Sequence, residues 1–360
     1  PATPPPITTT FVLSGILFAI YKSIIIKKLK LYMNILVTGG AGYIGSHVIE
    51  LLRKKKSNNI FILDNLSTGY KILIDNNCKF FKGDINNAKL VKQIITKHNI
   101  ETIIHLAALL NISEAETNKK KYNKNNITGT KNLILSCKNT KVKNFIFSSS
   151  CAVYGNIKGS VDEKRKPNPQ SHYGYTKYKS EELIKKYAKK INYNFGIFRY
   201  FNVAGASPSG KIGEIEMSHG HLIKNIAIQS MNKKPKININ GNNYPTKDGT
   251  CIRDYIHVSD LADIHLKGLN YLVKNKKSFV LNCGYGKGYS VLQITSRFKK
   301  IKKNLKINFI KKRAGDIAQV YSSTKKFKKL LKWKPKYNNI DLIIKSAIKW
   351  EKNYYLAGNS

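Results

Sequence analysis

Short apolar runs alternate with longer amphipathic segments over the first half of the chain. The runs are rich in β-branched and aromatic residues, as strands are, and the segments between them have helical spacing of apolar positions. The strands that we predict are Ile35–Thr38, Ile60–Asp64, Lys79–Lys82, Thr102–Leu106, Asn144–Ser148 and Phe195–Tyr200. The helices that we predict are Tyr43–Lys55, Ala88–His98, Lys119–Lys138 and Tyr173–Lys190. This alternation is typical of a doubly wound, Rossmann-type α/β fold with a parallel sheet.

The rhythm loosens after Asn202. Short strands, a few helices and turns rich in Gly, Pro and Asn, such as GNNYPTKDGT, follow. We expect these residues to form a smaller C-terminal α/β domain over the carboxyl edge of the sheet, where α/β proteins bind their ligands. The predicted division is therefore 33–202 for the Rossmann domain and 203–360 for the second domain.

Residues 1–32 differ from the rest of the chain. They open on PATPPP and continue with an uncharged stretch, Ile7–Tyr21. This stretch is shorter than the ~20 apolar residues that a membrane-spanning helix needs. Basic residues follow it, whereas a signal peptide places them first. Two expectations stay open: an upstream extension before a start at Met33, or a targeting or anchor segment.

The chain is strongly basic, with 64 Lys and Arg against 20 Asp and Glu and a formal net charge of +44. Only six of the basic residues are Arg, and arginine is the side chain that base and phosphate recognition prefers. The lysines accompany many Asn and Ile residues, as an AT-rich gene would encode. We therefore expect a solvated lysine surface that attracts anionic substrates, and no nucleic-acid partner.

The five cysteines are dispersed and show no CxxC spacing. This pattern argues against a zinc site, so we expect no bound metal. An odd, scattered set of cysteines fits free thiols in a reducing compartment. We therefore expect a cytoplasmic protein without a stable membrane partner.

A glycine-rich turn joins the first predicted strand to the first helix in NILVTGGAGYIGSH. The GxxGxxG spacing of Gly39, Gly42 and Gly45 permits a tight turn, close approach of a pyrophosphate and close packing of helix on strand. Asp64 ends the next strand, where a carboxylate accepts hydrogen bonds from ribose hydroxyls and repels a 2′-phosphate. The sequence therefore predicts NAD as the cofactor.

A second pattern carries catalytic residue types. Ser150 closes the serine run of FSSSCAVYG, and YGYTK places Tyr173 and Lys177 one helical turn apart. A tyrosine base must work about three units below its ordinary pKa of about 10, and an adjacent ammonium group stabilises the phenolate. The Ser150 hydroxyl would bond the same substrate oxygen. These three residues are the predicted catalytic set for hydride transfer to NAD.

Several strings between residue 33 and about residue 350 resemble the extended short-chain dehydrogenase/reductase family, and within it the UDP-glucose 4-epimerases. They are VTGGAGYIGSH, LDNLSTG, KGDI, NNITGT, VKNFIFSSSCAVYG, YGYTK, FRYFNVAGASPSG, PTKDGTCIRDYIHVSDLA and AGD. The resemblance implies an isomerase that interconverts UDP-glucose and UDP-galactose by reversible oxidation at C4, through a 4-keto sugar. It also implies NAD on the first domain, the UDP-sugar on the second, and a homodimer formed through Lys119–Lys138 and Tyr173–Lys190.

The resemblance further implies which residues contact the ligands. The expected NAD contacts are Gly39, Gly42, Tyr43, Ile44, Gly45, Asp64, Asn65, Ser67, Asp84, Ile85, Leu106, Ala107, Ala108, Asn125, Ser150, Tyr173, Lys177 and Tyr200. The expected UDP-sugar contacts are Ser150, Tyr173, Asn202, His221, Leu222, Arg253, Arg313, Asp316 and Val320. Arginine suits a diphosphate because its guanidinium group binds phosphate oxygens in pairs. Leu110 stands where the family usually has a lysine near the pyrophosphate, which predicts weaker NAD binding.

The residues after Ser150 bear on the alternatives with the same fold. Nucleotide-sugar dehydratases need an acid pair there and UDP-glucuronate decarboxylases usually a Glu, but this chain has Cys151, Ala152 and Val153. An epimerase for UDP-N-acetylglucosamine or UDP-glucuronate stays open, because Val320 in place of a large aromatic side chain would leave room for an N-acetyl group. A non-catalytic nucleotide-sugar-binding protein also stays open, although the complete Ser–Tyr–Lys set argues against it.

Overall fold

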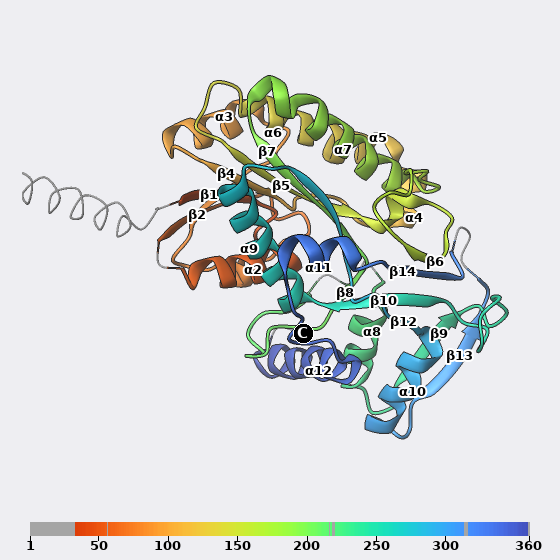
Figure 1. Cartoon of the computed structure of the whole chain (residues 1–360). Coiled ribbons are helices and arrows are strands. Elements are labelled where there is room, and N and C mark those ends of the chain that lie inside the picture. The colour runs from red at the N-terminus through yellow and green to blue at the C-terminus, as the bar shows by residue number, and fades with distance from the viewer. Residues whose placement is uncertain (1–32, 56, 216, 218–219, 313–315, 359–360) are drawn as a thin grey trace, which may run out of the picture.

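A computed structural model of the chain describes residues 33–55, 57–215, 217, 220–312 and 316–358 (Figure 1). The expectations for residues 1–32 and for Arg313 lie outside these residues. A large twisted sheet with helices on both faces forms one part of the molecule. Smaller sheets and the C-terminal helix form the other part, on one side of the large sheet (Figure 1).

The large sheet has seven strands, all parallel, in the order β11-β7-β5-β4-β1-β2-β3. Its strands are β1 (Met33–Thr38), β2 (Asn58–Asp64), β3 (Lys79–Lys82), β4 (Thr102–His105), β5 (Asn144–Ser150), β7 (Asn194–Tyr200) and β11 (Phe279–Cys283). The order reverses between β1 and β4, which is where doubly wound sheets bind ligands. The predicted fold class, a doubly wound Rossmann-type sheet, is confirmed.

Helices cover both faces of this sheet. One face carries α2 (Tyr43–Arg53) and α9 (Val258–Asn275), with α11 (Lys325–Leu331) beside α9. The other face carries α3 (Ala88–Lys97), α6 (Gly129–Ser136) and α7 (His172–Ile191). Alternate residues of one strand enter two cores: Ile35 and Val37 pack under α2 and α9, and Leu36 packs on the opposite side. Burial on both faces explains the nearly continuous apolar runs of these strands.

The predicted helical stretch Lys119–Lys138 is helical as far as Ser136, but its middle is not a regular α-helix. After the short α4 (Ile112–Thr117), the chain forms α5 (Lys119–Tyr122) and a π-helical segment, η2 (Asn123–Thr128), before α6 begins. The wider turn places the buried Asn126 side chain between two other segments, as described below, and this tertiary contact has no signature in apolar periodicity. Such π-helical turns occur frequently at functional sites.

The predicted strand boundaries also differ at two places beside the site. The fifth strand continues to Ser150 and does not end at Ser148, and it is followed by a 3₁₀ turn, η3 (Cys151–Tyr154). The fourth strand ends at His105, one residue earlier than predicted. Another 3₁₀ turn, η1 (Lys71–Leu73), lies between β2 and β3.

The remaining elements surround a separate apolar core on the side of α12 (Ile340–Leu356). One small sheet contains β6 (Lys158–Val161), β8 (Asn202–Ala204), β10 (Ile252–His257), β12 (Gly288–Ser290) and β14 (Gln319–Ser322). The other pairs β9 (Lys236–Asn240) with β13 (Lys306–Ile310), and α8 (Leu222–Gln229) and α10 (Val291–Ile301) pack nearby.

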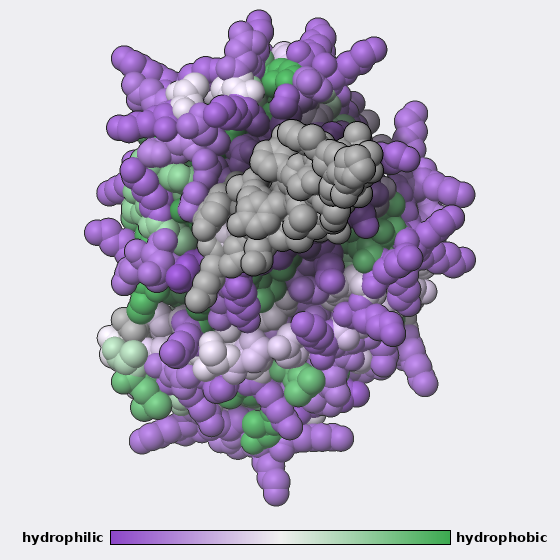
Figure 2. Space-filling model, turned by 60° about the vertical axis from the view of Figure 1, so that its left-hand side comes forward, coloured by the Kyte–Doolittle hydropathy of each residue, from purple (hydrophilic) through white to green (hydrophobic). Residues whose placement is uncertain are grey.

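The domain boundary at residue 202 stays a prediction. Each of the two parts contains elements from both sides of that boundary. Strand β11 and helix α9 come from beyond residue 202 but belong to the large sheet, whereas β6 comes from before it and pairs with β14 in the small sheet. Hydrophilic side chains project over most of the face shown in Figure 2. None of the helices among the described residues is both long and apolar enough to span a bilayer.

A candidate active site at the carboxyl edge of the large sheet

The glycine turn after β1 is shaped by close backbone contacts. Gly39 has a φ of +75°, and a Cβ atom there would lie 2.6 Å from the backbone nitrogen of Ala107. A Cβ atom at Gly45 would collide with the carbonyl oxygen of Gly39. Helix α2 begins at Tyr43 with Gly42 as its N-cap, which has no side chain to cover the first backbone N–H groups. The turn therefore leaves a helix N-terminus open toward the sheet edge, where a pyrophosphate is stabilised.

The acidic residues after β2 and β3 are held by hydrogen bonds. Asp64 is buried, and its carboxylate accepts hydrogen bonds from the backbone N–H groups of Ala41 and Leu66 at 3.0 and 2.8 Å. Burial raises the pKa of Asp64, and these bonds act against the rise. The Asp84 carboxylate accepts a bond from the Asn65 amide at 2.9 Å. Burial of Asp84 is outweighed by hydrogen bonds, chiefly from Asn86, so its pKa is lowered.

The loop after β4 lies against the glycine turn. Leu106 donates its backbone N–H to Thr38 at 3.0 Å, and Ala107 is the residue that approaches Gly39. Leu110, where a lysine was expected, packs in an apolar cluster with Tyr122 and Tyr173. Its side chain therefore contributes packing next to the predicted base and brings no charge to the predicted pyrophosphate position.

The π-helical segment connects this loop to α7. Asn126 accepts a hydrogen bond from the Leu109 backbone N–H at 2.9 Å and donates to the hydroxyl of Thr176 at 3.0 Å. Asn125, a predicted NAD contact, donates its amide N–H to Asn126 at 2.9 Å. A buried amide thus joins three segments that are distant in sequence, which fixes α7 relative to the β4 loop.

The predicted catalytic residues meet where β5 faces α7. Tyr173 and Lys177 are buried, with exposed fractions of 8% and 2%, and the Lys177 ammonium lies 6.0 Å from the Tyr173 ring centroid. The same ammonium group donates to the carbonyl oxygen of Ser148 at 2.8 Å and lies 5.0 Å from the Phe147 ring centroid. The Ser150 hydroxyl lies near enough to Tyr173 to act on its pKa. The structure therefore brings Ser150, Tyr173 and Lys177 together.

Burial dominates the electrostatics of this group. It raises the pKa of Tyr173, and the neighbouring Ser150 hydroxyl acts in the opposite direction. It also lowers the pKa of Lys177 to about 7, against the attraction of Glu181. Desolvation thus favours the neutral forms of both Tyr173 and Lys177. Positive charge brought into the site by a bound ligand would act against this effect at Tyr173, because it stabilises the phenolate.

Tyr200 lies at the end of β7, directly opposite Ser150 in the sheet. It is almost fully buried, and its hydroxyl is hydrogen-bonded to Nε2 of His265 at 2.5 Å. Burial lowers the pKa of His265 to about 4, so its ring is neutral at neutral pH. Tyr200 is thus fixed by α9 at the edge where the cofactor is predicted.

Three predicted UDP-sugar residues line one small hollow of about 20 Å³. They are Asn202 on β8, and His221 and Leu222 at the start of α8. The Nδ1 atom of His221 lies 2.6 Å from the Glu214 carboxylate. Burial lowers the pKa of His221, but Glu214 outweighs this effect and the net shift is upward. The hollow therefore has a cationic side chain on its wall at mildly acidic pH.

Arg253, Asp316 and Val320 form a second group, in the small sheet. Arg253 and Val320 are paired residues of β10 and β14, and Arg253 lies 3.8 Å from the Asp316 carboxylate. Val320 is buried in an apolar cluster that Cys151, the residue after Ser150, also contacts. This cluster places β14 beside the end of β5. The third predicted anion-binding residue, Arg313, lies outside the described residues.

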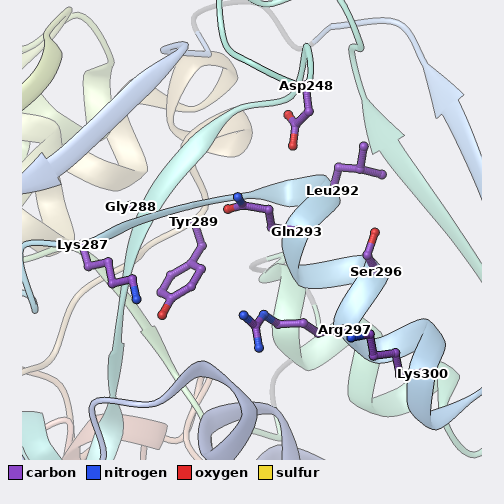
Figure 3. Close-up of a pocket in the computed structure, with 9 residues that line it drawn as sticks. All are labelled: Asp248, Lys287, Gly288, Tyr289, Leu292, Gln293, Ser296, Arg297 and Lys300. Atoms are coloured by element: carbon purple, nitrogen blue, oxygen red, sulfur yellow. The ribbon is translucent and has the colours of Figure 1, made fainter.

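A separate open hollow of about 550 Å³ lies on one side of α10 (Figure 3). Its walls include Lys287, Tyr289 and Lys300, and none of the predicted site residues. Arg297, also on its wall, is paired with Asp341 at 2.7 Å. Because this hollow holds none of the predicted catalytic or NAD-binding residues, the sheet edge is the candidate active site.

Comparison with known proteins identifies the family and the fold. The sequence model of the "NAD dependent epimerase/dehydratase family" matches residues 35–284. The chain belongs to this family. It is 39% identical over 324 residues to a UDP-glucose 4-epimerase of Lactobacillus helveticus, covering 89% of this chain and 98% of that protein. The resemblance seen in the sequence is therefore confirmed.

Solved structures of the family agree. The UDP-glucose 4-epimerase of Bifidobacterium longum, in complex with NAD+ and UDP, superposes with a TM-score of 0.81 at 30% identity, covering 89% of this chain and 98% of that one. The UDP-Glc/GlcNAc 4-epimerase of Campylobacter jejuni superposes with a TM-score of 0.77 at 39% identity, covering 89% and 99%. NAD is the cofactor of this chain, as predicted.

The residues at the sheet edge fit this family's cofactor. Gly39 and Gly45 remove the Cβ atoms that would obstruct the turn, the open N-terminus of α2 suits a pyrophosphate, and the Asp64 carboxylate suits ribose hydroxyls. The individual contact residues stay predictions. Sequence reasoning missed Asn126, Glu181, Arg199 and Glu214. Glu181 had a visible signal, because it repeats the four-residue spacing of Tyr173 and Lys177.

Proposed function

We propose that this chain interconverts UDP-glucose and UDP-galactose by inverting C4 of the sugar, and is thus an isomerase. The supporting relatives carry the name UDP-glucose 4-epimerase at 35–39% identity across 89% of this chain. The observation that carries the proposal is the buried Tyr173–Lys177 pair beside the half-buried Ser150, at the carboxyl edge of the large sheet. A binding protein would not need a buried Tyr–Lys pair there.

The proposed mechanism assigns one task to each residue. Bound NAD would supply a reversible hydride acceptor for C4 of the sugar. Tyr173 takes the proton of the 4-hydroxyl group on its phenolate oxygen and gives it back when the 4-keto sugar is reduced. Lys177 stabilises the phenolate form of Tyr173 by charge. Ser150 donates a hydrogen bond to the same substrate oxygen.

Inversion requires the 4-keto sugar to turn over while its UDP group stays in place. We assign the diphosphate to Arg253, because a guanidinium group binds phosphate oxygens in pairs, and to Arg313 on the same chemical grounds. Asp316 orients Arg253, and Asn202, His221 and Leu222 line the neighbouring hollow. A fixed diphosphate and a turning sugar together allow the hydride to return to the other face.

The test is a coupled assay that follows conversion of UDP-galactose to UDP-glucose by purified, NAD-loaded protein. We expect turnover in the wild type. Tyr173→Phe should reduce kcat by about 10²–10⁴-fold, the range for loss of a general acid–base group, while the protein keeps its NAD. A wild-type protein that binds NAD and UDP-sugar without turnover would support the non-catalytic alternative.

The substrate range is a second question, and Val320 bears on it. Its compact side chain lies in the cluster beside Cys151, and a related structure at 39% identity is described as a UDP-Glc/GlcNAc 4-epimerase. We therefore expect turnover of UDP-N-acetylglucosamine as well, and loss of that activity alone in Val320→Tyr. No turnover of the N-acetyl sugar by an enzyme active on UDP-glucose would reject this. UDP-glucuronate belongs in the same panel as the remaining alternative.

The oligomeric state and location are also proposals. We expect a homodimer through α6 and α7, where Leu135 and Tyr175 are exposed apolar side chains. Light scattering after size-exclusion chromatography measures the mass directly, and a monomer at micromolar concentration would exclude this arrangement. A cytoplasmic location is supported by the five free cysteines.

A further inference from the structure

A buried ion pair lies behind the Tyr173–Lys177 pair. Glu181 on α7 and Arg199 on β7 are exposed by only 0% and 3%. Arg199 donates Nε and Nη2 hydrogens to the two carboxylate oxygens of Glu181 at 2.8 and 2.6 Å. The Ser149 hydroxyl donates to the same carboxylate at 2.6 Å. The arrangement is bidentate and charge-assisted, which makes it strong and directional.

Consecutive serines of β5 meet successive turns of α7. The carbonyl oxygen of Ser148 accepts the Lys177 ammonium, whereas the hydroxyl of Ser149 donates to Glu181. The next serine along the strand, Ser150, lies near enough to Tyr173 to act on its pKa. Residues four apart share one face of a helix. The register of β5 on α7 therefore sets the catalytic pair and the ion pair together.

Other contacts extend the pair across the sheet. The Arg199 guanidinium carbon lies 4.7 Å from the ring centroid of Tyr154 in η3. The Tyr154 hydroxyl donates to Asn282 on β11 at 2.7 Å. Stability alone does not explain such a pair, because well-packed apolar residues in place of a buried ion pair are often as stable or more so. A role in the chemistry of the adjacent lysine does explain it.

We propose that Glu181, held in place by Arg199, is a positioning residue for Lys177: it fixes the turn of α7 that carries the lysine, and its negative charge favours the ammonium form. The proposal rests on the proposed function, in which Lys177 must be charged to stabilise the phenolate of Tyr173. The pKa of Lys177 agrees, since burial lowers it to about 7 and Glu181 acts upward.

The other titratable groups around Lys177 do not supply this charge. Burial lowers the pKa of His105 on β4 to about 3, so its ring is neutral, and burial raises the pKa of Tyr173 on α7, so it is neutral too. Arg199 is a cation, and so is Lys185 on α7, whose ammonium group lies 3.4 Å from the Glu181 carboxylate. Among the residues that the structure describes, Glu181 is the anion that acts on Lys177.

Glu181→Gln keeps the shape of the side chain and removes its charge. We expect the alkaline limb of the kcat–pH profile to move about one unit to lower pH, since a tenfold change in the proton affinity of Lys177 is one pKa unit. At pH 8 kcat should fall about tenfold, with KM for the UDP-sugar changed less than twofold. Glu182→Gln, at the neighbouring position on α7, is the matched control and should leave the profile unchanged.

A double variant separates positioning from simple stabilisation. Glu181→Met with Arg199→Met removes both charges and should restore thermal stability lost in the single variant, while the profile stays shifted. A double variant with wild-type stability and a wild-type profile would overturn the proposal, as would an unshifted profile in Glu181→Gln.

A readout without turnover keeps this inference distinct from the proposed function. Below pH 7 Lys177 is charged and gains from Glu181, whereas at pH 9 it is largely neutral. The Tm deficit of Glu181→Gln should therefore be larger at pH 6 than at pH 9, and this difference should disappear in a Lys177→Met background. If the wild type is inactive but the Tm deficit of Glu181→Gln still depends on pH, only the proposed function is rejected. If the Tm deficit does not depend on pH, the proposed role of Glu181 is rejected.

Discussion

The edge of the large sheet and the region around β10 prepare their predicted ligand sites by different means. At the sheet edge, backbone geometry does most of the work: Gly39 and Gly45 admit close contacts, and Asp64 is held by backbone N–H groups. Around β10, side chains from distant elements hold one another, as Lys224 and Glu351 do at 2.6 Å. The first site depends on local conformation, whereas the second depends on pairs that a single substitution can break.

The largest expected effect comes from breaking a pair in the second region. Lys224→Met leaves the buried Glu351 without its cation, so we expect the free energy of unfolding to fall by about 3–5 kcal/mol, less whatever Glu351 recovers by taking up a proton. Chemical denaturation at pH 7 measures it. Lys224→Met combined with Glu351→Leu should recover most of the loss, and a double variant as unstable as the single one would contradict this account.

The glycine turn after β1 should instead be sensitive to an added side-chain atom. A Cβ atom at Gly45 meets the Gly39 carbonyl, so Gly45→Ala should lower the free energy of unfolding by about 1–3 kcal/mol and weaken NAD retention. Gly42→Ala is the control for stability alone, because its Cβ atom would lie 3.3 Å from the same oxygen, whereas Gly42 is itself a predicted NAD contact. Denaturation curves compare the two variants, and the NAD content of the purified protein is measured for Gly45→Ala. Equal losses of stability at the two positions would refute the steric explanation.

A substitution at Arg253 tests ligand binding with the fold intact. Arg253→Lys keeps the charge and loses the paired donors, so we expect KM for the UDP-sugar to rise about tenfold, with little change in Tm. The exposed Arg165 supplies the control, since Arg165→Lys should change neither quantity. An unchanged KM in Arg253→Lys would remove Arg253 from the diphosphate site.

The smallest expected effect is a pH dependence of stability from His221. Its folded pKa is raised above the ordinary value of about 6.5, so its contribution is fully present below about pH 6.5 and is lost as pH rises through the folded pKa. The side chain is 40% exposed, so solvent screening limits the contribution to under about 1 kcal/mol. His221→Asn should flatten this part of the stability–pH curve, and an unchanged slope would contradict the effect.

The same contrast explains what the sequence reveals. The glycine turn, Asp64 and the Tyr173–Lys177 spacing lie within short segments, so their patterns are visible along the chain. The pair Lys224–Glu351 joins residues 127 positions apart, and no local pattern marks it. Glu181 is intermediate: its spacing on α7 was visible, but its partner Arg199 required knowledge of which strands are neighbours.

The π-helical turn and strand β11 show a second limit of prediction from sequence. Apolar periodicity predicted one helix over Lys119–Lys138, because a single wide turn hardly disturbs the pattern. The amide of Asn126 bonds to Leu109 and Thr176, and only the folded arrangement shows this. Strand β11 was not predicted at all, since short apolar runs after residue 202 do not indicate which sheet they join.

The position of β11 also bears on how the protein forms as it leaves the ribosome. Its residues, Phe279–Cys283, pair with β7, so the large sheet stays incomplete until the chain has been synthesised beyond residue 283. Until then β7 presents an unpaired edge with apolar side chains, the kind of edge that recruits other strands. A nascent chain halted after β8 therefore has a cofactor turn but an aggregation-prone flank. We therefore expect soluble production of this Rossmann unit alone only when β11 and α9 are included.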